Sequence, residues 1–385
     1  MAGRQRGARV LGAAARHVPN PADPGRPPRA GARPRREWPV SLGCDGQRAG
    51  PSRPPRRARP MSPPAHIPLG PGGEFDRIRA IIAGLGPDAG DLGDDCALIP
   101  LGGTILAVSI DASLEDVHFR TDWLSFPEIG WRAAAAALSD LAADGATPLG
   151  ALVSLGVPDN GKRTSDNDDA AVEIMTGVGA AAQSVGAKVL GGDLVRAEKY
   201  LVDVCVLGTA ERPVRRVGAH VGDGLWVTGM LGGAQLALRE LMAGRRPDPE
   251  VMRRFAQPVP RIAAGRWLAA NGATAMIDLS DGLVGDAAQL AAASGVGIEI
   301  ALERVPSWLG VEPLLAVASG EEYELLVALP TVFGEPQARR FRQAHDLPLT
   351  RIGTCAVGRG VRYTDRGAPV AVPRGYDHFP PPPPG

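Results

Sequence analysis

The alternation of apolar and polar positions predicts a regular succession of helices and strands from about residue 73 onward. Apolar residues recur at helical spacing over 75–85 and stop at the glycines of "GLGPDAG". Two further helices are expected, in the alanine-rich run 131–146 and over 169–186. Short apolar runs are typical of buried strands, and they occur at 104–111, 149–157, 188–193 and 200–210.

The second half of the chain repeats this style. Helices are expected at 233–241, 261–272 and 283–294, and strands at 225–229, 275–280, 297–302, 322–330, 349–357 and 360–365. We place a domain boundary in the intervening segment 211–224. The mixed order of strands and helices predicts two α+β domains, spanning 73–210 and 211–379, which suits a chain of 385 residues.

Aspartates recur where these patterns break, at predicted strand ends and glycine-containing turns. The stretch "LGDDCALIP" sets two acids against a run that resembles a buried strand, and "MIDLSDGL" sets two more into an apolar run. Ionised carboxylates beside a core need a partner. If they converged, each close pair would cost roughly 4 kcal/mol at about 4 Å. The aspartates concerned are Asp94, Asp95, Asp111, Asp140, Asp193, Asp278 and Asp281.

A hard cation would relieve such crowding, and oxygen-only ligands favour Mg²⁺ first. The alternative, that each aspartate forms a turn or caps a helix, stays open at this point. The D-x-[DN]-x-[DN]-G spacing of a calcium-binding loop does not occur in the sequence.

Several familiar nucleotide and metal motifs are missing or incomplete. "GVPDNGKR" approaches the phosphate-loop pattern, but Arg163 stands where the metal-binding hydroxyl belongs, so we interpret it as a solvated loop. No convincing Rossmann glycine fingerprint, protein-kinase motif set or Cys/His zinc spacing is present. A bound nucleotide would therefore be held more by carboxylates and metal ions than by a glycine cradle.

The formal net charge is zero, but the charge is unevenly distributed. Residues 1–60 carry 14 Arg, no Lys and 3 acids, a net charge of +11, which leaves −11 for the remainder. This Pro-, Arg- and Gly-rich stretch lacks apolar periodicity, so we expect disorder. It has no signal-peptide core, and its prolines argue against a transit peptide. We favour Met61 as the true start over nucleic-acid binding by this segment.

Four scattered cysteines, without a CxxC pair, fit a reducing compartment, and we expect a cytoplasmic protein. No uncharged apolar stretch reaches about 18 residues, so no membrane association is expected. The proline-rich tail 380–385 is expected to be disordered.

Nine motifs occur in the order seen in thiamine-monophosphate kinases: "GEFDRI", "LGDDCALI", "VSID…EDVHF", "LSDLAADGA", "GGD", "WVTG", "IDLSDGL", "SGEEYELL" and "GYDHF". The chain resembles that family, part of the aminoimidazole ribonucleotide synthetase superfamily, over about 73–379. The resemblance implies two α/β-sandwich-like domains and a homodimer joined through the N-terminal ones. It also implies ATP- and Mg²⁺-dependent phosphorylation of thiamine phosphate to thiamine diphosphate, the last step of that biosynthesis.

The resemblance also implies roles for individual residues. The family's substrate contacts match His118 and Glu321, and its ATP contacts match Gly192, Asp193, Arg216 and Ser280. Its metal-binding positions match Asp95, Ser109, Asp111, Asp140, Asp193, Asp278 and Asp281, with Asp94 ranked just below Asp95. Taken alone, His118 suits a packed histidine, Glu321 a solvated turn acid, and Ser280 the cap of the following helix.

The implied reaction needs no general base. The attacking atom is a phosphate oxygen, which is largely ionised at neutral pH because its second pKa is near 6. Direct in-line transfer then depends on bringing two polyanions together, for which Mg²⁺ ions and Arg216 supply the positive charge.

The sequence departs from the family pattern at several positions. Ile110, Ala112 and Leu194 replace threonines, and Asp144 replaces a methionine. Pro373 stands where a thiamine-contacting tryptophan is expected; Trp308 could take that place, although we favour a core role for it. These departures keep two alternatives open: an enzyme of the same superfamily with a different acceptor, and a non-catalytic nucleotide-binding paralogue.

Overall fold

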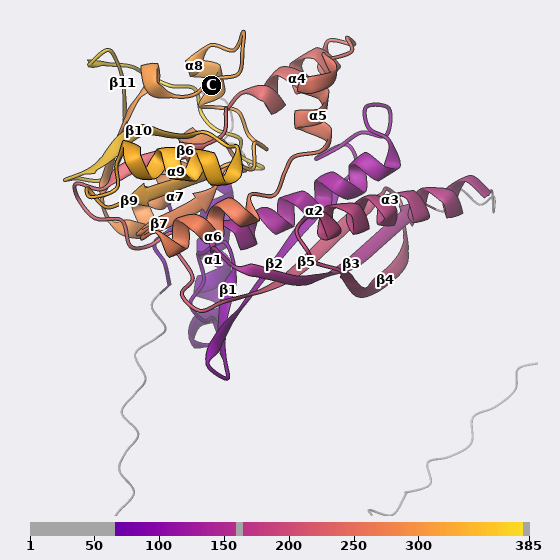
Figure 1. The fold of residues 1–385 in the computed structure, drawn as a ribbon. Helices are drawn as coiled ribbons and strands as arrows, with labels where there is room; N and C mark the ends of the chain where they lie inside the picture. Colours follow the sequence, from indigo (N-terminus) through magenta and orange to yellow (C-terminus); the bar gives the residue numbers. More distant parts are fainter. Residues whose placement is uncertain (1–65, 159–164, 380–385) are drawn as a thin grey trace, which may run out of the picture. The chain divides into compact units, whose positions relative to one another are not determined.

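The computed structural model describes residues 66–158 and 165–379. Our expectations for the extension 1–60, for Cys44 and for the tail 380–385 lie outside the described residues. Two β-sheets follow one another along the chain, the first between residues 97 and 210 and the second between 224 and 369 (Figure 1). Two α+β domains are thus confirmed, while their boundaries at 73–210 and 211–379 stay predictions.

The first sheet has five strands in the order β1–β2–β5–β3–β4. Only β3 and β4 run parallel, and the helix α3 (Ser165–Ser184) connects them. The strands are β1 (Ala97–Leu101), β2 (Thr104–Leu114), β3 (Thr147–Pro158), β4 (Val189–Ala197) and β5 (Leu201–Ala210).

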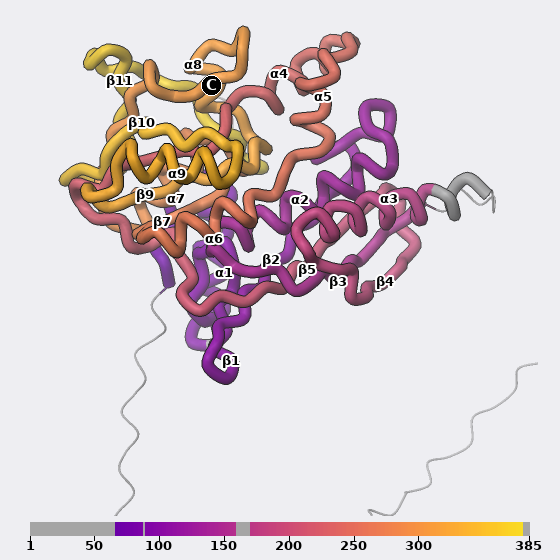
Figure 2. The backbone as a smooth tube through the Cα atoms, viewed as in Figure 1, coloured from indigo at the N-terminus to yellow at the C-terminus, as the bar shows by residue number. Residues whose placement is uncertain are grey.

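The helices α2 (Phe126–Ala143) and α3 cover one face of this sheet (Figures 1 and 2). Alternate residues of β5, namely Val202, Val204 and Val206, are fully buried beneath α2, as the two-residue period of a strand requires. At the N-terminus of α2, Ser125 and Glu128 form a capping box. The alanine run of α2 is buried on nearly all sides, which fits its lack of polar residues.

The two helices and α6 (Ile262–Ala270) touch through their backbones. A Cβ atom built on Gly130 of α2 would lie 1.8 Å from the Ile174 carbonyl oxygen of α3, and one on Gly177 would lie 1.9 Å from the Pro127 oxygen. On another side of α2, a Cβ on Gly265 would lie 1.9 Å from the Ala142 oxygen. Any side chain at these three glycines would separate the helices, so α2 is fixed between two neighbours.

The second sheet has seven strands in the order β12–β11–β8–β10–β6–β9–β7. They are β6 (Gly224–Thr228), β7 (Ala275–Asp278), β8 (Gly297–Ala301), β9 (Leu325–Leu329), β10 (Leu349–Ala356), β11 (Gly360–Asp365) and β12 (Ala368–Pro369). The remaining helices are α1 (Gly73–Leu85), α4 (Gly233–Met242), α5 (Pro249–Ala256), α7 (Leu283–Ser294), α8 (Pro313–Ala316) and α9 (Glu335–His345), with short 3₁₀ turns at Gly86–Asp88 and Leu302–Arg304.

Both faces of the second sheet are buried at its centre. Trp226 and Val327 belong to the core shared with α2, α6 and α9, whereas Leu225 and Leu326, one residue away, pack with α7 in a second core. This explains why β6, β7 and β9 are buried at every position and read as continuous apolar runs.

Three strand predictions were wrong in detail. β1 is mostly exposed, because it is the edge strand of its sheet. β2 continues past Asp111 to Leu114, and β4 continues through the glycines and Asp193 to Ala197, so neither acid ends a strand. The residues Asp111 and Asp193 therefore sit within the sheet, where their orientation follows the strand period.

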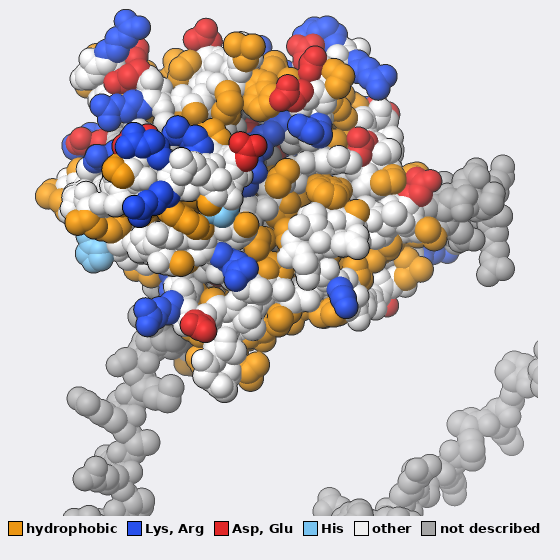
Figure 3. Space-filling model, in the orientation of Figure 1, with side chains coloured by type: hydrophobic (Ala, Val, Ile, Leu, Met, Phe, Trp, Pro, Cys, Tyr) orange, Lys and Arg blue, Asp and Glu red, His pale blue; other side chains and the backbone are white. Residues whose placement is uncertain are grey.

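Three helices were not predicted from the sequence: α5, the four-residue α8 and α9. The apolar positions of α9 are few, and it buries only Ala338 and Phe341. Figure 3 shows Lys and Arg side chains gathered over α9, whereas the surface over α3 in that view carries few charges. Within 66–158 and 165–379, none of the helices combines the length and the apolar character that a bilayer crossing requires.

Candidate active site

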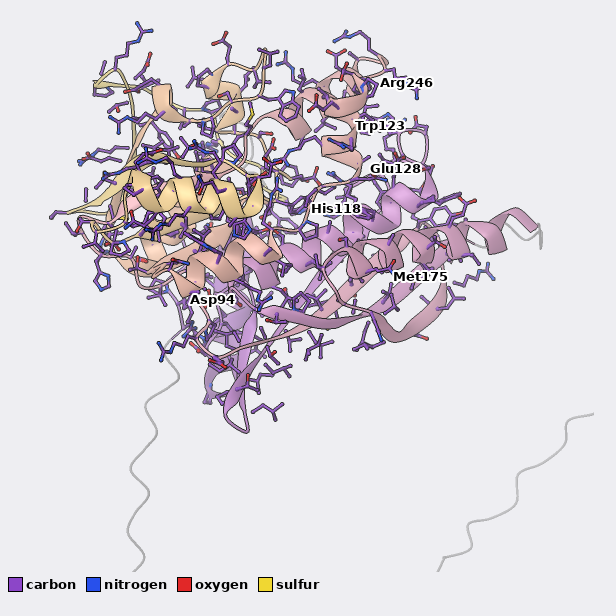
Figure 4. The ribbon with its side chains drawn as sticks, viewed as in Figure 1. Asp94, His118, Trp123, Glu128, Met175 and Arg246 are labelled. Atoms are coloured by element: carbon purple, nitrogen blue, oxygen red, sulfur yellow. The ribbon has the colours of Figure 1, made fainter. Side chains whose placement is uncertain are left out.

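A cavity of about 800 Å³ is bounded by α2, β2, the loop after β7 and the loop before β9. All the predicted site residues except Gly192 and Asp193 line it. Figure 4 labels three lining residues, Asp94, His118 and Trp123, which come from different segments of the N-terminal half. A cavity of this volume suits a small-molecule site.

Five aspartates converge at the C-terminal end of α2. Asp94 and Asp95 precede β1, Asp140 and Asp144 end α2, and Asp278 ends β7. One ligand atom each from Asp95, Asp140 and Asp278 lie within 4.8 Å of one another, and the same holds for Asp94, Asp95 and Asp144. We call these five residues the aspartate cluster. Convergence of the acids, which the sequence predicted, is thus observed for four of the predicted residues and for Asp144.

The aspartate cluster disfavours its own ionisation. Burial, and then the neighbouring Asp95, raise the pKa of Asp278 to about 8. Burial, followed by Asp111 and Asp278, raises the pKa of Asp140 well above its usual range. Like charges this close cannot all be ionised without a counter-ion. The donor set of carboxylate oxygens fits a hard divalent cation such as Mg²⁺.

Two arginines compensate part of this charge. The Arg215 Nε donates to Asp94 at 2.5 Å, and the Arg216 side chain donates to Asp95 at 2.6 Å. The Arg216 guanidinium is buried, which opposes its charge, and yet Asp95 raises its pKa. Only one oxygen of Asp95 is engaged in this way; the other is buried and has no hydrogen-bond partner among the described residues.

Two predicted residues reach the cluster from β2. The Ser109 hydroxyl donates to the Asp140 carboxylate. Asp111 pairs with Val204, on the sheet face that α2 covers, which directs its side chain into the cavity. Burial, and then Asp203 and Asp95, raise the pKa of Asp111 to about 6.

The loop between β7 and α7 supplies Ser280 and Asp281. Ser280 does not cap α7: Gly282 occupies the cap position, with no side-chain capping bond. Instead, Ser280 lines the cavity, and its carbonyl accepts the Glu321 N–H. Burial, and then Glu74, raise the pKa of Asp281 to about 6, and the buried Asp286 accepts the Asp281 N–H at 3.2 Å.

His118 lines the same cavity and comes from the segment that follows β2. Its Nδ1 accepts the Leu114 N–H at 3.1 Å, so the neutral ring carries its proton on Nε2. Burial, and then the nearby His378 ring, lower the pKa of His118. A neutral ring of this kind can donate one hydrogen bond to a ligand.

Glu321 faces the same space from a strained loop. Its φ of 59° and that of Tyr323, 51°, lie in the left-handed region, which is costly for residues with side chains. Glu321 forms an ion pair with Arg132 of α2, whose side chain is only 4% exposed and whose guanidinium also lies 4.1 Å from the centre of the Phe255 ring. Strain of this kind is kept where the surroundings impose it.

Two neighbouring acids anchor that loop on its other side. Glu324 accepts hydrogen bonds from Thr228, Arg254 and Arg261, at 2.6–2.7 Å. Glu322 accepts from the Gly232 N–H and from Ser319. Burial alone would raise the pKa of Glu324, but Arg261 and Arg254 hold it at about 2. We call Glu322, Glu324, Arg254 and Arg261 the glutamate cluster.

Gly192 and Asp193 do not join the site within one chain. Asp193 aligns with Ser154, Asp203 and Ala112 across the sheet, so it lies three strands from β2 and on the face opposite to Asp111. Packing within the sheet explains why residue 192 is a glycine, because a Cβ atom there would lie 1.9 Å from the Val153 carbonyl oxygen.

Sequence reasoning missed three residues of the site. Asp144 was noted only as a departure from a family pattern, and Arg132 and Asp286 were not noticed. Arg132 and Asp286 lie inside helical patterns, where a charged residue normally faces solvent. No signal in a single sequence reveals that they point inward.

Family models of the AIR synthase related proteins match both halves of the chain. The N-terminal domain model matches residues 93–210, and the C-terminal domain model matches 220–365. The thiamine-monophosphate kinase of Halobacterium salinarum is 37% identical over 247 residues, 62% of this chain and 80% of that protein. The thiamine-monophosphate kinase of Aquifex aeolicus is 33% identical and covers 80% of this chain and 98% of its own length.

Solved structures give the same picture. A structure described as AaThiL complexed with AMPPCP and TMP has a TM-score of 0.70 and 31% identity, and covers 80% of this chain and 97% of its own. The hydrogenase maturation protein HypE, with a TM-score of 0.59 and 18% identity, shares the fold alone.

Proposed function

Because the chain belongs to the thiamine-monophosphate kinases, within the AIR synthase related family, we propose that it transfers the γ-phosphoryl group of ATP to thiamine phosphate. The product is thiamine diphosphate. One observation carries the chemistry: four carboxylates of the aspartate cluster, those of Asp94, Asp95, Asp140 and Asp278, line the cavity, and two arginines pair with the cluster. Carboxylates gathered in this way can hold the metal ions that phosphoryl transfer uses.

Mg²⁺ fits the residues present. One buried Asp95 oxygen has no hydrogen-bond partner among the described residues, and the pKa values of Asp140 and Asp278 are raised, so a divalent cation would neutralise the negative charge gathered there. Asp95, Asp140 and Asp278 would hold it, with Ser109, Asp111 and Asp281 within the same cavity. Bound there, Mg²⁺ supplies the positive charge that neutralises and aligns the phosphates of both substrates.

The chain's own groups position the substrates. Arg216 is fixed by Asp95 and adds positive charge beside the nucleotide phosphates. Ser280 and Asp281 lie just before the N-terminus of α7, where backbone N–H groups favour a phosphate. The acceptor phosphate is already ionised at neutral pH, which is consistent with the absence of a Ser–His–Asp arrangement from the described lining.

Thiamine phosphate would occupy the end of the cavity that holds His118, Glu321 and Arg132. The Nε2–H of His118 and the Glu321 carboxylate are the hydrogen-bonding groups there. Trp123 lines this space, with the Arg120 guanidinium 4.7 Å from the centre of its ring, and it can stack on a ligand ring in place of the tryptophan absent at Pro373. Trp308 instead packs against the main core, as favoured from the sequence.

A homodimer through the outer face of the first sheet would complete the site. The strand pairing places Ile99, Ile110, Leu152 and Val195 on that face, opposite the helices, and each is more than 40% exposed. An apolar face of this kind marks an interaction surface. Because Asp193 lies on the same face, a second copy is the way in which Gly192 and Asp193 could reach nucleotide.

We place the enzyme in the cytoplasm. The described cysteines, Cys96, Cys205 and Cys355, are all free thiols, which suits a reducing compartment. ATP and thiamine phosphate are its small-molecule partners in this proposal, with no nucleic-acid partner.

The test is to incubate the full chain with ATP, Mg²⁺ and thiamine phosphate, and to separate the thiamine esters by chromatography. Thiamine diphosphate should form, and only when Mg²⁺ is present. A folded protein that binds ATP but forms no diphosphate from thiamine phosphate would contradict the proposal. Screening other phosphorylated acceptors would then separate a related kinase from a non-catalytic nucleotide-binding protein.

A further inference from the structure

Asp144 is a buried acid that the proposed phosphoryl transfer does not use. It ends α2 as the C-cap residue, its side chain does not reach the lining of the cavity, and it is 0% exposed. Both of its carboxylate oxygens are buried without a hydrogen-bond partner among the described residues. A buried carboxylate left in this way costs several kcal/mol, roughly, unless a cation or proton is bound.

Asp144 lies beside two other carboxylates. One oxygen each of Asp94, Asp95 and Asp144 lie within 4.8 Å of one another. The C-terminal end of α2, which carries no basic residue in its last turn, adds the negative end of the helix dipole. The Cys96 thiol and Arg216 are close enough to favour the charged form, but burial, and then Asp95 and Asp94, raise the pKa of Asp144 well above its usual range.

The nearby arginines are already engaged. Arg215 is held by Asp91 and Asp94, and Arg216 by Asp95. After these contacts, one Asp95 oxygen and both Asp144 oxygens remain without a donor. Asp94 and Asp144 approach Asp95 as one group of ligand atoms, and Asp140 and Asp278 approach it as another.

We propose that Asp94, Asp95 and Asp144 form a second divalent-cation site, which is filled without nucleotide and shares Asp95 with the site formed by Asp140 and Asp278. Three carboxylates and no nitrogen or thiolate ligand select a hard cation, Mg²⁺ or Mn²⁺. Asp94 and Asp95 line the cavity, which gives the ion a path of entry. Asp144 does not line the cavity and supplies its carboxylate from the protein interior. Two ions that share one carboxylate lie about 4 Å apart.

The proposal does not depend on the identity of the acceptor, because its test contains neither ATP nor thiamine phosphate. The full chain is stripped with a chelator and titrated with Mn²⁺, and free and bound Mn²⁺ are distinguished by electron paramagnetic resonance. The wild type should bind two ions per chain with a spin-coupled signal. Asp144→Asn should bind one, with affinity for the second reduced at least about tenfold and the coupling lost.

Two further variants keep the result interpretable. Asp144→Met removes both oxygens and should lose the second ion in the same way. Asp223→Asn is the matched control: Asp223 is also buried, but it accepts from Thr274 and His220 outside the aspartate cluster, so two ions should remain bound. Circular dichroism confirms that each variant is folded.

Thermal unfolding gives an independent readout. In chelator, Asp144→Asn should melt at or above the wild-type temperature, because a like charge is removed, and the rise in melting temperature caused by Mg²⁺ should be smaller than in the wild type. One bound Mn²⁺ in the wild type, or unchanged stoichiometry in both Asp144 variants, would overturn the proposal. In the second case a proton, rather than a metal ion, neutralises Asp144.

Discussion

Two groups of buried acids lie on either side of the loop that carries Glu321, and they differ in their charge balance. The glutamate cluster sets two carboxylates against two guanidinium groups. The aspartate cluster sets five carboxylates against two. Asp95, Asp144 and Asp278 of one cluster and Glu322 and Glu324 of the other are all buried, so burial alone does not account for the difference.

The pKa values follow that difference. Arginine holds the pKa of Glu324 at about 2 against the effect of burial, whereas burial and like charges raise that of Asp278 to about 8. In the glutamate cluster the negative charges are balanced by arginines of the same chain, and the cluster holds the strained loop in place. The aspartate cluster has more carboxylates than arginine partners, and unbalanced buried charge of this kind is a sign of function and not of stability.

The largest expected effect comes from Asp140→Asn, which removes one charge from the aspartate cluster. We expect kcat for thiamine diphosphate formation to fall by roughly 10³-fold, because the charge that holds Mg²⁺ against the phosphates is lost. The melting temperature in chelator should not fall. Turnover is measured by chromatography of the thiamine esters, and stability by calorimetry. Full turnover in this variant would remove Asp140 from the metal site.

Glu324→Gln should show the opposite profile. Two buried guanidinium groups lose their carboxylate, and we expect the free energy of unfolding to fall by about 3–5 kcal/mol, with or without Mg²⁺. Urea unfolding followed by circular dichroism measures this change. A loss of stability that changed when chelator was added would show that the two clusters are not independent.

The smallest effect is the pH dependence of the glutamate cluster. The pKa of Glu324 is about 2 in the folded chain against an ordinary value of 4.5, so its contribution is present above pH 4.5 and is lost as pH falls toward 2. The difference in unfolding free energy between wild type and Glu324→Gln should be constant from about pH 7 to 5 and shrink below pH 4.5. Urea titrations at each pH measure it; a difference that grows with acidity would contradict the assignment.

Much of the fold was predictable because its core helices and strands have strong periodicity. The alanine run of α2 and the apolar strand β5 were found within a few residues, since each is buried on a regular face. Burial of β1 was predicted wrongly because an apolar strand at a sheet edge has the same sequence pattern as a central one. The helix α9 was missed because nine of its eleven residues face outward or partly outward and its charges hide the period.

The site was predictable where acids interrupt apolar runs, as Asp95 and Asp278 do. The site was not predictable where the acid stands at the end of a helix, as Asp144 does at the end of α2. In a sequence, a buried C-cap aspartate looks the same as a solvent-exposed one. The position of Gly192 and Asp193 relative to the cavity was also not predictable. The alternation of a strand shows which sheet face a residue occupies only once the ends of the strand and its pairing register are known.

Arg132, Asp140 and Asp144 lie along the helix α2, and close backbone contacts at glycines hold α2 against α3 and α6. Backbones in van der Waals contact on two sides leave no room for α2 to slide or rotate. Its amide protons should therefore be among the last to exchange with heavy water. Any opening of the cavity that admits substrate on the microsecond-to-millisecond timescale must therefore come from movement of the segments that face α2. The helix α2 itself stays in place during this movement.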